Sequence, residues 1–175
     1  MTEIIEHETK TQELYWHKMT QFKFDLNYYA CHFSFCVKTM RTIRISIAVI
    51  TALSTAIWME WNAVEHLSGI CAGIIIVLQV LSTCTELLPY DKRKQEIRDL
   101  QNLLSPVYDA MEKDWSKISD GQYTKEEIRN KVYDYSAKNR EIHQHFFKDD
   151  SLPLSKKLER KAEKLTTEYY KTMFQ

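Results

Sequence analysis

Glycine and proline are scarce in this sequence, with three of each among 175 residues. Such scarcity argues against a β-sandwich, a barrel or a disordered chain, all of which depend on turn residues. Only Gly121 lies outside the apolar segments described below. A glycine-rich phosphate loop or a dinucleotide-binding motif is therefore excluded.

Recognisable metal and catalytic motifs are missing as well. The four cysteines show no CxxC spacing. The six histidines form no HExxH motif and no zinc-spaced pair with cysteine. His143 and His145 are two residues apart, so on a helix they would point to different sides. We expect no metal, no cofactor and no catalytic residues, and we do not expect an enzyme.

Charge balances over the whole chain but is absent from two segments. The sequence has 24 basic and 24 acidic residues and a mean hydropathy of -0.44, as in a soluble helical protein. However, residues 45 to 59 and residues 67 to 85 contain no Asp, Glu, Lys or Arg. With their flanks, the segments 43–61 and 67–88 have 19 and 22 residues. A helix of 19 residues reaches roughly 28 Å, close to the thickness of a bilayer core.

These two segments predict a membrane hairpin. A buried hairpin in a soluble protein is the alternative, although a chain of this size could hardly cover two helices that are apolar all round. Basic residues lie at both ends of the hairpin in the sequence, with Lys38 and Arg41 before the first segment and Lys92 and Arg93 after the second. The connection 60–66 has acidic residues and no Lys or Arg. The positive-inside rule therefore predicts a multi-pass protein with both termini in the cytoplasm.

The regions on either side of the hairpin predict amphipathic helices. From Tyr15 to Ile43, apolar side chains recur at alternating spacings of four and three, and we call these residues the seam. This seam packs either on other copies of the chain or on the chain's own C-terminal helices, and the periodicity leaves both open. The residues of the seam are Tyr15, Met19, Phe22, Leu26, Tyr29, Phe33, Cys36, Met40 and Ile43.

The C-terminal region, residues 89–175, predicts about three more helices. An apolar stripe runs from Ile97 to Ile118, and Thr124 with Glu127 has the spacing of a capping box that starts the next helix. A last stripe includes Leu154, Leu158, Ala162, Leu165, Tyr169 and Met173. The predicted fold is all-α: an N-terminal amphipathic helix (1–42), a two-transmembrane hairpin (43–88) and a cytosolic helical bundle (89–175).

Polar residues recur inside both predicted spans. Polar residues on one face of a membrane helix either join helices by hydrogen bonds or line a water-filled path, and the sequence leaves both interpretations open. The candidates for lining a path are Arg44, Thr51, Thr55, Gln79, Thr83 and Glu86, and those for an apolar gate are Ile74, Val77 and Leu81. Gly69 and Gly73 form a GxxxG motif, which allows helices to approach closely. Two helices cannot enclose a path alone, so transport would require an oligomer, and a tetramer is favoured.

A basic cluster near the C-terminus is the candidate ligand site. It consists of Lys156, Lys157, Arg160, Lys161 and Lys164. Such a face can bind the phosphates of a nucleotide or an oligonucleotide. A solvated helix face is the alternative, because acidic residues are interleaved with the basic ones.

The order of these segments resembles the SLATT-type two-transmembrane effectors of bacterial defence, such as the membrane effectors of Hailong-type signalling systems. The resemblance rests on Arg41 and Arg44 before the first span, residues 58–65 at the turn and residues 86–94 after the second span. It implies a homo-oligomeric pore in the bacterial inner membrane that acts in abortive antiphage defence. It also implies gating by a nucleotide or oligonucleotide from a partner nucleotidyltransferase.

The sequence thus leads to two functional hypotheses. The first is an ion channel in contact with membrane lipids, gated through its cytosolic helices. The second is a membrane-anchored scaffold whose helical bundle recruits a soluble partner.

Overall fold

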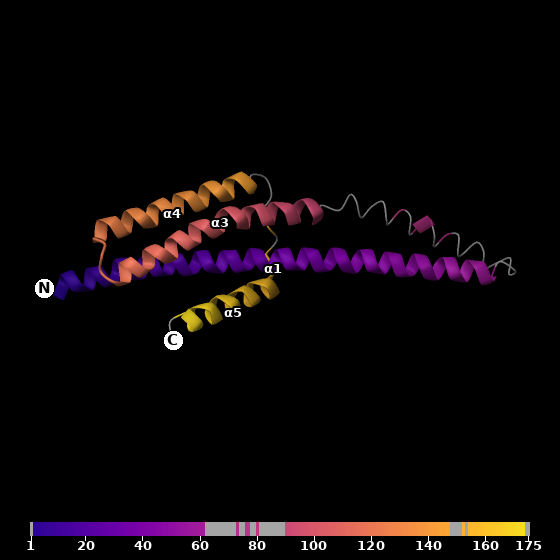
Figure 1. Ribbon diagram of the computed structural model, residues 1–175, viewed down its shortest axis with the longest axis horizontal. Coiled ribbons are helices and arrows are strands. Elements are labelled where there is room, and N and C mark those ends of the chain that lie inside the picture. The colour runs from indigo at the N-terminus through magenta and orange to yellow at the C-terminus, as the bar shows by residue number, and fades with distance from the viewer. Residues whose placement is uncertain are drawn as a thin grey trace. The chain divides into compact units, whose positions relative to one another are not determined.

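The computed structural model describes residues 2–61, 73, 76, 77, 80, 90–147, 152 and 154–173. These residues form four long helices and no strand, so the predicted all-α class is confirmed for them. The helices are α1 (Thr2–Trp61), α3 (Tyr90–Ser119), α4 (Lys125–Phe146) and α5 (Lys156–Met173) (Figure 1).

The chain divides into two compact units, and α1 contributes to both. The first, which we call the helical unit, contains residues up to Phe33 and residues from Gln95 to Gln175. The second unit contains Ser34–Lys94. The helical unit therefore combines the first half of α1 with most of α3 and with α4 and α5.

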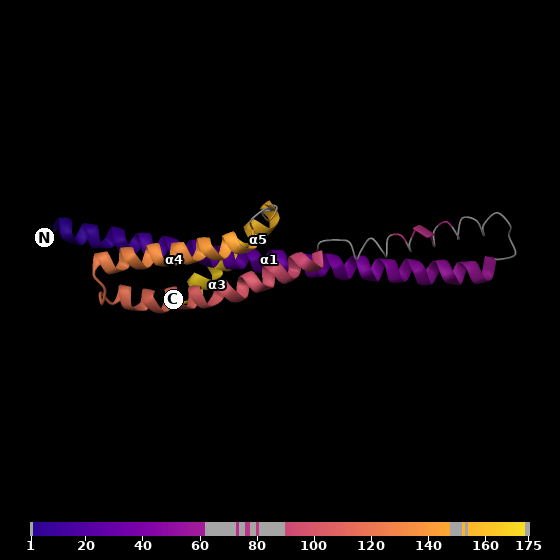
Figure 2. The same cartoon turned by 90° about the horizontal axis from the view of Figure 1, so that it is seen from above.

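The first half of α1 packs on helices of its own chain. Its seam residues Tyr15, Met19, Phe22 and Tyr29 are buried in one apolar cluster with residues of α3 and α4. Figures 1 and 2 both place α3 and α4 along this half of α1. Within the helical unit, the structure therefore shows the intramolecular alternative for the seam.

The helix α3 contributes the residues that pack against the buried face of α1. Ile97, Leu100, Leu104 and Met111 are fully or almost fully buried, as the apolar stripe predicts. Tyr108, which follows the stripe residue Val107, is also buried. The aromatic residues of α1 thus face a continuous apolar surface of α3.

The turn between α3 and α4 follows the sequence signals. Gly121 ends α3 with a φ of 71°, a left-handed conformation that glycine adopts without steric cost. Thr124 then starts α4 as a capping box. The Glu127 backbone N–H donates to the Thr124 hydroxyl at 3.4 Å, and the Thr124 N–H donates to the Glu127 carboxylate at 2.7 Å. The predicted start of this helix is confirmed.

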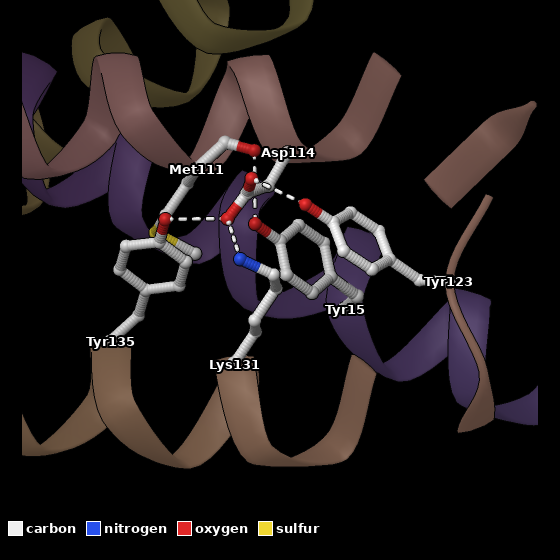
Figure 3. A network of polar contacts seen from close by, with 6 residues as sticks. All are labelled: Tyr15, Met111, Asp114, Tyr123, Lys131 and Tyr135. Carbon is white, nitrogen blue, oxygen red and sulfur yellow. Dashed lines mark hydrogen bonds and ion pairs between the residues drawn. The ribbon is translucent and has the colours of Figure 1, made fainter. Parts of the chain in front are cut away.

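A polar network that the sequence did not predict ties α3 to α4 (Figure 3). The Asp114 carboxylate accepts hydrogen bonds from Lys131 at 2.6 Å and from Tyr135 at 2.8 Å. Burial opposes ionisation of Asp114, but these hydrogen bonds outweigh it and lower the pKa of the carboxyl group. Next to it, the Tyr15 hydroxyl of α1 donates to the Met111 carbonyl at 2.9 Å. Polar contacts therefore fix three helices beside the apolar core.

The contact face of α5 agrees with the predicted stripe in part. Its buried residues are Ala162 and Thr166, whereas Leu154 is 91% exposed and Leu165 is exposed. The Asn27 amide of α1 donates to the Thr166 hydroxyl at 2.9 Å. The predicted stripe is therefore confirmed at Ala162 and Tyr169 but not at Leu165, and Thr166 joins the buried face through its contact with Asn27.

In the second unit, no helix within the described residues is long and apolar enough to cross a membrane. A crossing helix needs about 20 mainly apolar residues, whereas the uncharged stretch of α1 between Arg44 and Glu60 has 15. The predicted multi-pass location in the bacterial inner membrane, with both termini in the cytoplasm, is contradicted by this finding. The membrane hairpin is not confirmed.

The candidate residues of the predicted spans are only partly described. Arg44 and Thr51 are exposed on α1, and the Thr51 hydroxyl donates to the Ile47 carbonyl of its own helix at 2.8 Å. Val77 is exposed, and a Cβ at Gly73 would meet no described atom within 4 Å. The Thr55 side chain and the residues Gly69, Ile74, Gln79, Leu81, Thr83 and Glu86 lie outside what the structure describes. Their roles stay predictions.

Candidate functional site

Two neighbouring cavities lie between α1 and α4 in the helical unit. The first has a volume of about 480 Å³ and the second about 330 Å³, within the range of small-molecule sites. Both are lined by Asp25 of α1 and by Arg140 and His143 of α4. These three side chains mark the junction of the two cavities.

The first cavity has aromatic walls. Phe24 and Tyr28 of α1 stack with ring centroids 6.3 Å apart, and Tyr29 stacks on Phe147 at the same distance. The Tyr28 hydroxyl accepts a hydrogen bond from the Ser155 backbone N–H at 3.2 Å, which brings the segment before α5 to the cavity. The remaining lining residues are Gln144, Leu152, Leu154 and Glu159. This cavity is suited to a flat, largely apolar group.

The second cavity is more polar. Lys18 and Gln21 of α1 line it opposite Ser136 and Asn139 of α4. Tyr135, fixed by its hydrogen bond to Asp114, forms part of the same wall. The remaining lining residues are Phe22 and Met111. A cation, a hydroxyl and two amides can together bind an anionic or hydroxylated group.

Asp25 is a partly buried carboxylate that accepts few hydrogen bonds in return for its loss of solvation. Its Oδ1 accepts one hydrogen bond, from Gln21 Nε2 at 3.1 Å on the same helix. Burial raises the pKa of its carboxyl group from 3.8 to about 6, although the Gln21 hydrogen bond acts in the opposite direction. Perturbed carboxyl groups in cavities are typical of functional sites.

Arg140 and His143 complete the junction. Arg140 is exposed and makes no hydrogen bond or ion pair, with Asp25 or otherwise, to any residue that the structure describes. His143 lies beside Tyr29, whose hydroxyl is 3.3 Å from Nδ1 and 3.4 Å from Nε2. Burial lowers the pKa of His143, so its imidazole is neutral near pH 7. The junction therefore presents one negative and one positive side chain that do not neutralise each other.

Within the described part of the chain, no three His, Cys, Asp or Glu side chains gather closely enough to hold a metal ion. Cys31 and Cys36 are buried, and burial raises the pKa of both thiols, which disfavours the reactive thiolate.

The basic candidates of α5 lie elsewhere. Lys156, Lys157, Arg160, Lys161 and Lys164 are all exposed, and none is among the residues that line the two cavities. Lys164 forms an ion pair of 3.7 Å with Glu168 on its own helix. The α5 residue that reaches the first cavity is the acidic Glu159. Ligand binding by the basic face stays a prediction.

Sequence reasoning missed the three junction residues, although weak signals pointed to them. Asn139 lines the second cavity, and it interrupts an apolar stripe of α4 that consists of Ile128, Val132, Tyr135, Ile142 and Phe146. His143 and His145 do lie on different sides of α4, since His145 lines a separate groove with Leu103 and Val107. A polar residue on an otherwise apolar helix face was the signal that could have located the cavity.

Comparisons of the chain with known protein families, curated proteins and solved structures found no match. The resemblance to two-transmembrane defence effectors therefore stays a hypothesis.

Proposed function

We propose that the helical unit is a ligand-responsive regulatory module, and that it binds a nucleotide in the two cavities between α1 and α4. The observation that carries the proposal is the pairing of an aromatic cavity with a polar one through Asp25 and Arg140. A nucleotide has the same division into a flat base and a charged, hydroxylated remainder. Bases stack on aromatic side chains, and guanidinium groups bind phosphate.

Each part of the site has a role in this proposal. The aromatic rings of the first cavity accommodate the base, and Asp25 faces its polar edge. Arg140 and Lys18 attract the phosphate toward the second cavity, where Ser136 and Asn139 offer hydrogen bonds to the sugar. The exposed lysines of α5 are weaker candidates, because charge on a solvated helix face is non-specific.

Ligand binding would stabilise the packing of the helices that form the walls. The walls come from α1, from α4 and from the segment before α5. A ligand that binds only the folded unit adds about 2.7 kcal/mol to its free energy of unfolding at a hundredfold excess over the dissociation constant. This coupling is the regulatory output that we propose for the module.

The proposal is limited to the helical unit. The pore predicted from the sequence presupposes membrane-crossing helices, so it is not part of this proposal. The predicted homo-oligomer and the scaffold that recruits a soluble partner stay predictions.

Isothermal titration calorimetry and thermal unfolding with nucleoside monophosphates test the proposal. We expect saturable binding and a higher melting temperature in their presence. Arg140→Gln should weaken binding roughly tenfold, the effect of losing one charge-assisted hydrogen bond. Lys161→Gln is the matched control on the basic face of α5 and should bind as the unchanged protein does. Absence of heat and of stabilisation with every nucleotide would refute the proposal.

A further inference from the structure

Asp25 has an unused acceptor at the junction of the two cavities. Gln21 Nε2 donates to its Oδ1 at 3.1 Å, and no other described residue forms a hydrogen bond or ion pair with this carboxylate. Its Oδ2 therefore has no donor from the described part of the protein. A carboxylate accepts through both oxygens, so Oδ2 can accept a hydrogen bond from a bound ligand.

The neighbours of Asp25 do not supply that donor. Lys18 lines the second cavity and Arg140 lines both, but neither forms an ion pair with Asp25. Tyr135 donates to Asp114, and His143 is in contact with the Tyr29 hydroxyl. A partly buried carboxylate in this state is costly to the fold, and a donor on a bound molecule would remove part of that cost.

We infer that Asp25 recognises an exocyclic amino group on the base of the bound nucleotide. This inference rests on the proposed nucleotide binding. Adenine, cytosine and guanine carry such a group, whose N–H bonds can donate to the open carboxylate oxygen. Uracil and hypoxanthine present a carbonyl oxygen at the corresponding positions, and two acceptors facing each other repel. Asp25 thus determines specificity by accepting from amino bases and rejecting oxo bases.

Pairs of nucleotides that differ at one edge of the base test this role. Adenosine and inosine monophosphate differ at position 6 of the purine, and cytidine and uridine monophosphate differ at position 4 of the pyrimidine. Near pH 7 we expect the amino member of at least one pair to bind about tenfold more tightly, as for other polar readouts of a base edge. Calorimetry of the full chain measures both affinities of each pair.

Asp25→Asn identifies the residue responsible. The amide has nearly the same shape but offers both a donor and an acceptor, so it tolerates a carbonyl as well as an amino group. We expect this variant to lose the preference and to bind the oxo member at least as tightly as the unchanged protein does. Glu159→Gln, at the other carboxylate of the first cavity, is the matched control and should retain the preference. Circular dichroism verifies that both variants are folded.

Three results would overturn the inference. Equal affinity for the members of both pairs removes the role of Asp25 but leaves the proposed nucleotide binding intact. If Glu159→Gln loses the preference and Asp25→Asn retains it, Glu159 and not Asp25 recognises the amino group. No binding of any nucleotide by the unchanged protein refutes the proposed function together with this inference.

Discussion

Tyr29 and His143 meet between α1 and α4, with the tyrosine hydroxyl 3.3 Å from the Nδ1 of the imidazole. Their ring centroids lie 5.6 Å apart, and the Phe147 ring lies 6.3 Å from Tyr29 and 6.0 Å from His143. This contact joins the buried seam of α1 to the helix that carries Arg140. Both side chains line the aromatic cavity.

Tyr29→Phe removes the hydroxyl from this contact without changing the ring. We expect a loss of about 1 kcal/mol in the free energy of unfolding, the usual effect of one hydrogen bond. The pKa of His143 should stay below its ordinary value, because burial is the cause of its shift. Urea unfolding measures the first effect, and an NMR titration of the imidazole measures the second. A return of the His143 pKa to its ordinary value would show that the hydroxyl is the cause.

Asp25→Asn should stabilise the protein near pH 7. The raised pKa means that the folded state favours the protonated carboxyl, so ionisation of Asp25 opposes folding. This penalty is absent below the ordinary value of 3.8, grows as the pH rises toward about 6 and is complete above it. It amounts to at most about 3 kcal/mol, at 1.36 kcal/mol for each pKa unit.

Thermal unfolding of Asp25→Asn at two pH values measures this effect. We expect the melting temperature to rise by several degrees near pH 7 and to change little near pH 4. An equal change at both pH values would mean that charge is not the reason. A stabilising substitution in a cavity is typical of a residue retained for function.

Lys131→Met should destabilise the packing of α4 on α3. The substitution leaves the Asp114 carboxylate, whose side chain is 12% exposed, without its ion pair at 2.6 Å. We expect a loss of about 2 kcal/mol near pH 7, less than for a fully buried pair because the Lys131 side chain is 29% exposed. Lys113→Met, on the exposed side of α3, is the control and should be nearly neutral.

The effect of Lys131→Met should depend on pH in a defined direction. The pKa of Asp114 is lowered, so its contribution is present above its ordinary value of 3.8 and is lost as the pH falls through its folded value. The difference between Lys131→Met and the unchanged protein should therefore shrink in strong acid. Urea unfolding across this range measures it, and a difference that is independent of pH would exclude the ion pair as the cause.

Thr166→Val tests how α5 is attached. The substitution keeps the shape of the side chain but leaves the Asn27 amide without its acceptor at 2.9 Å. We expect a loss of about 1 kcal/mol and faster hydrogen exchange along α5. Thr167→Val is a close control, because both hydroxyls also donate to the carbonyl four residues earlier, at 2.8 and 2.9 Å. Similar losses in the two variants would show that the contact with α1 is unimportant.

Local signals predicted the helices of the helical unit well. Thr124 and Glu127 marked the start of α4, because a capping box depends only on residues three apart. The seam of α1 and the stripe of α3 predicted which faces are buried. Their spacing follows from the helix repeat and needs no knowledge of the partner.

The face of α5 and the candidate site were less predictable. The Thr166 hydroxyl is buried because Asn27 reaches it from α1, and the two residues are 139 positions apart. Asp25, Arg140 and His143 belong to no motif, and they line the same cavities only after α4 has packed on α1. The basic cluster of α5 was conspicuous in the sequence, yet it lies outside these cavities.

The sequence by itself determined the helical class, the start of α4 and the apolar faces of α1 and α3, because these depend on spacing within one helix. Only the tertiary structure decided that the first half of the seam of α1 packs within its own chain, and that Asp25 and Arg140 line one pair of cavities. The physical reason is that periodicity describes one surface of a helix. What covers that surface depends on contacts between residues far apart in the chain.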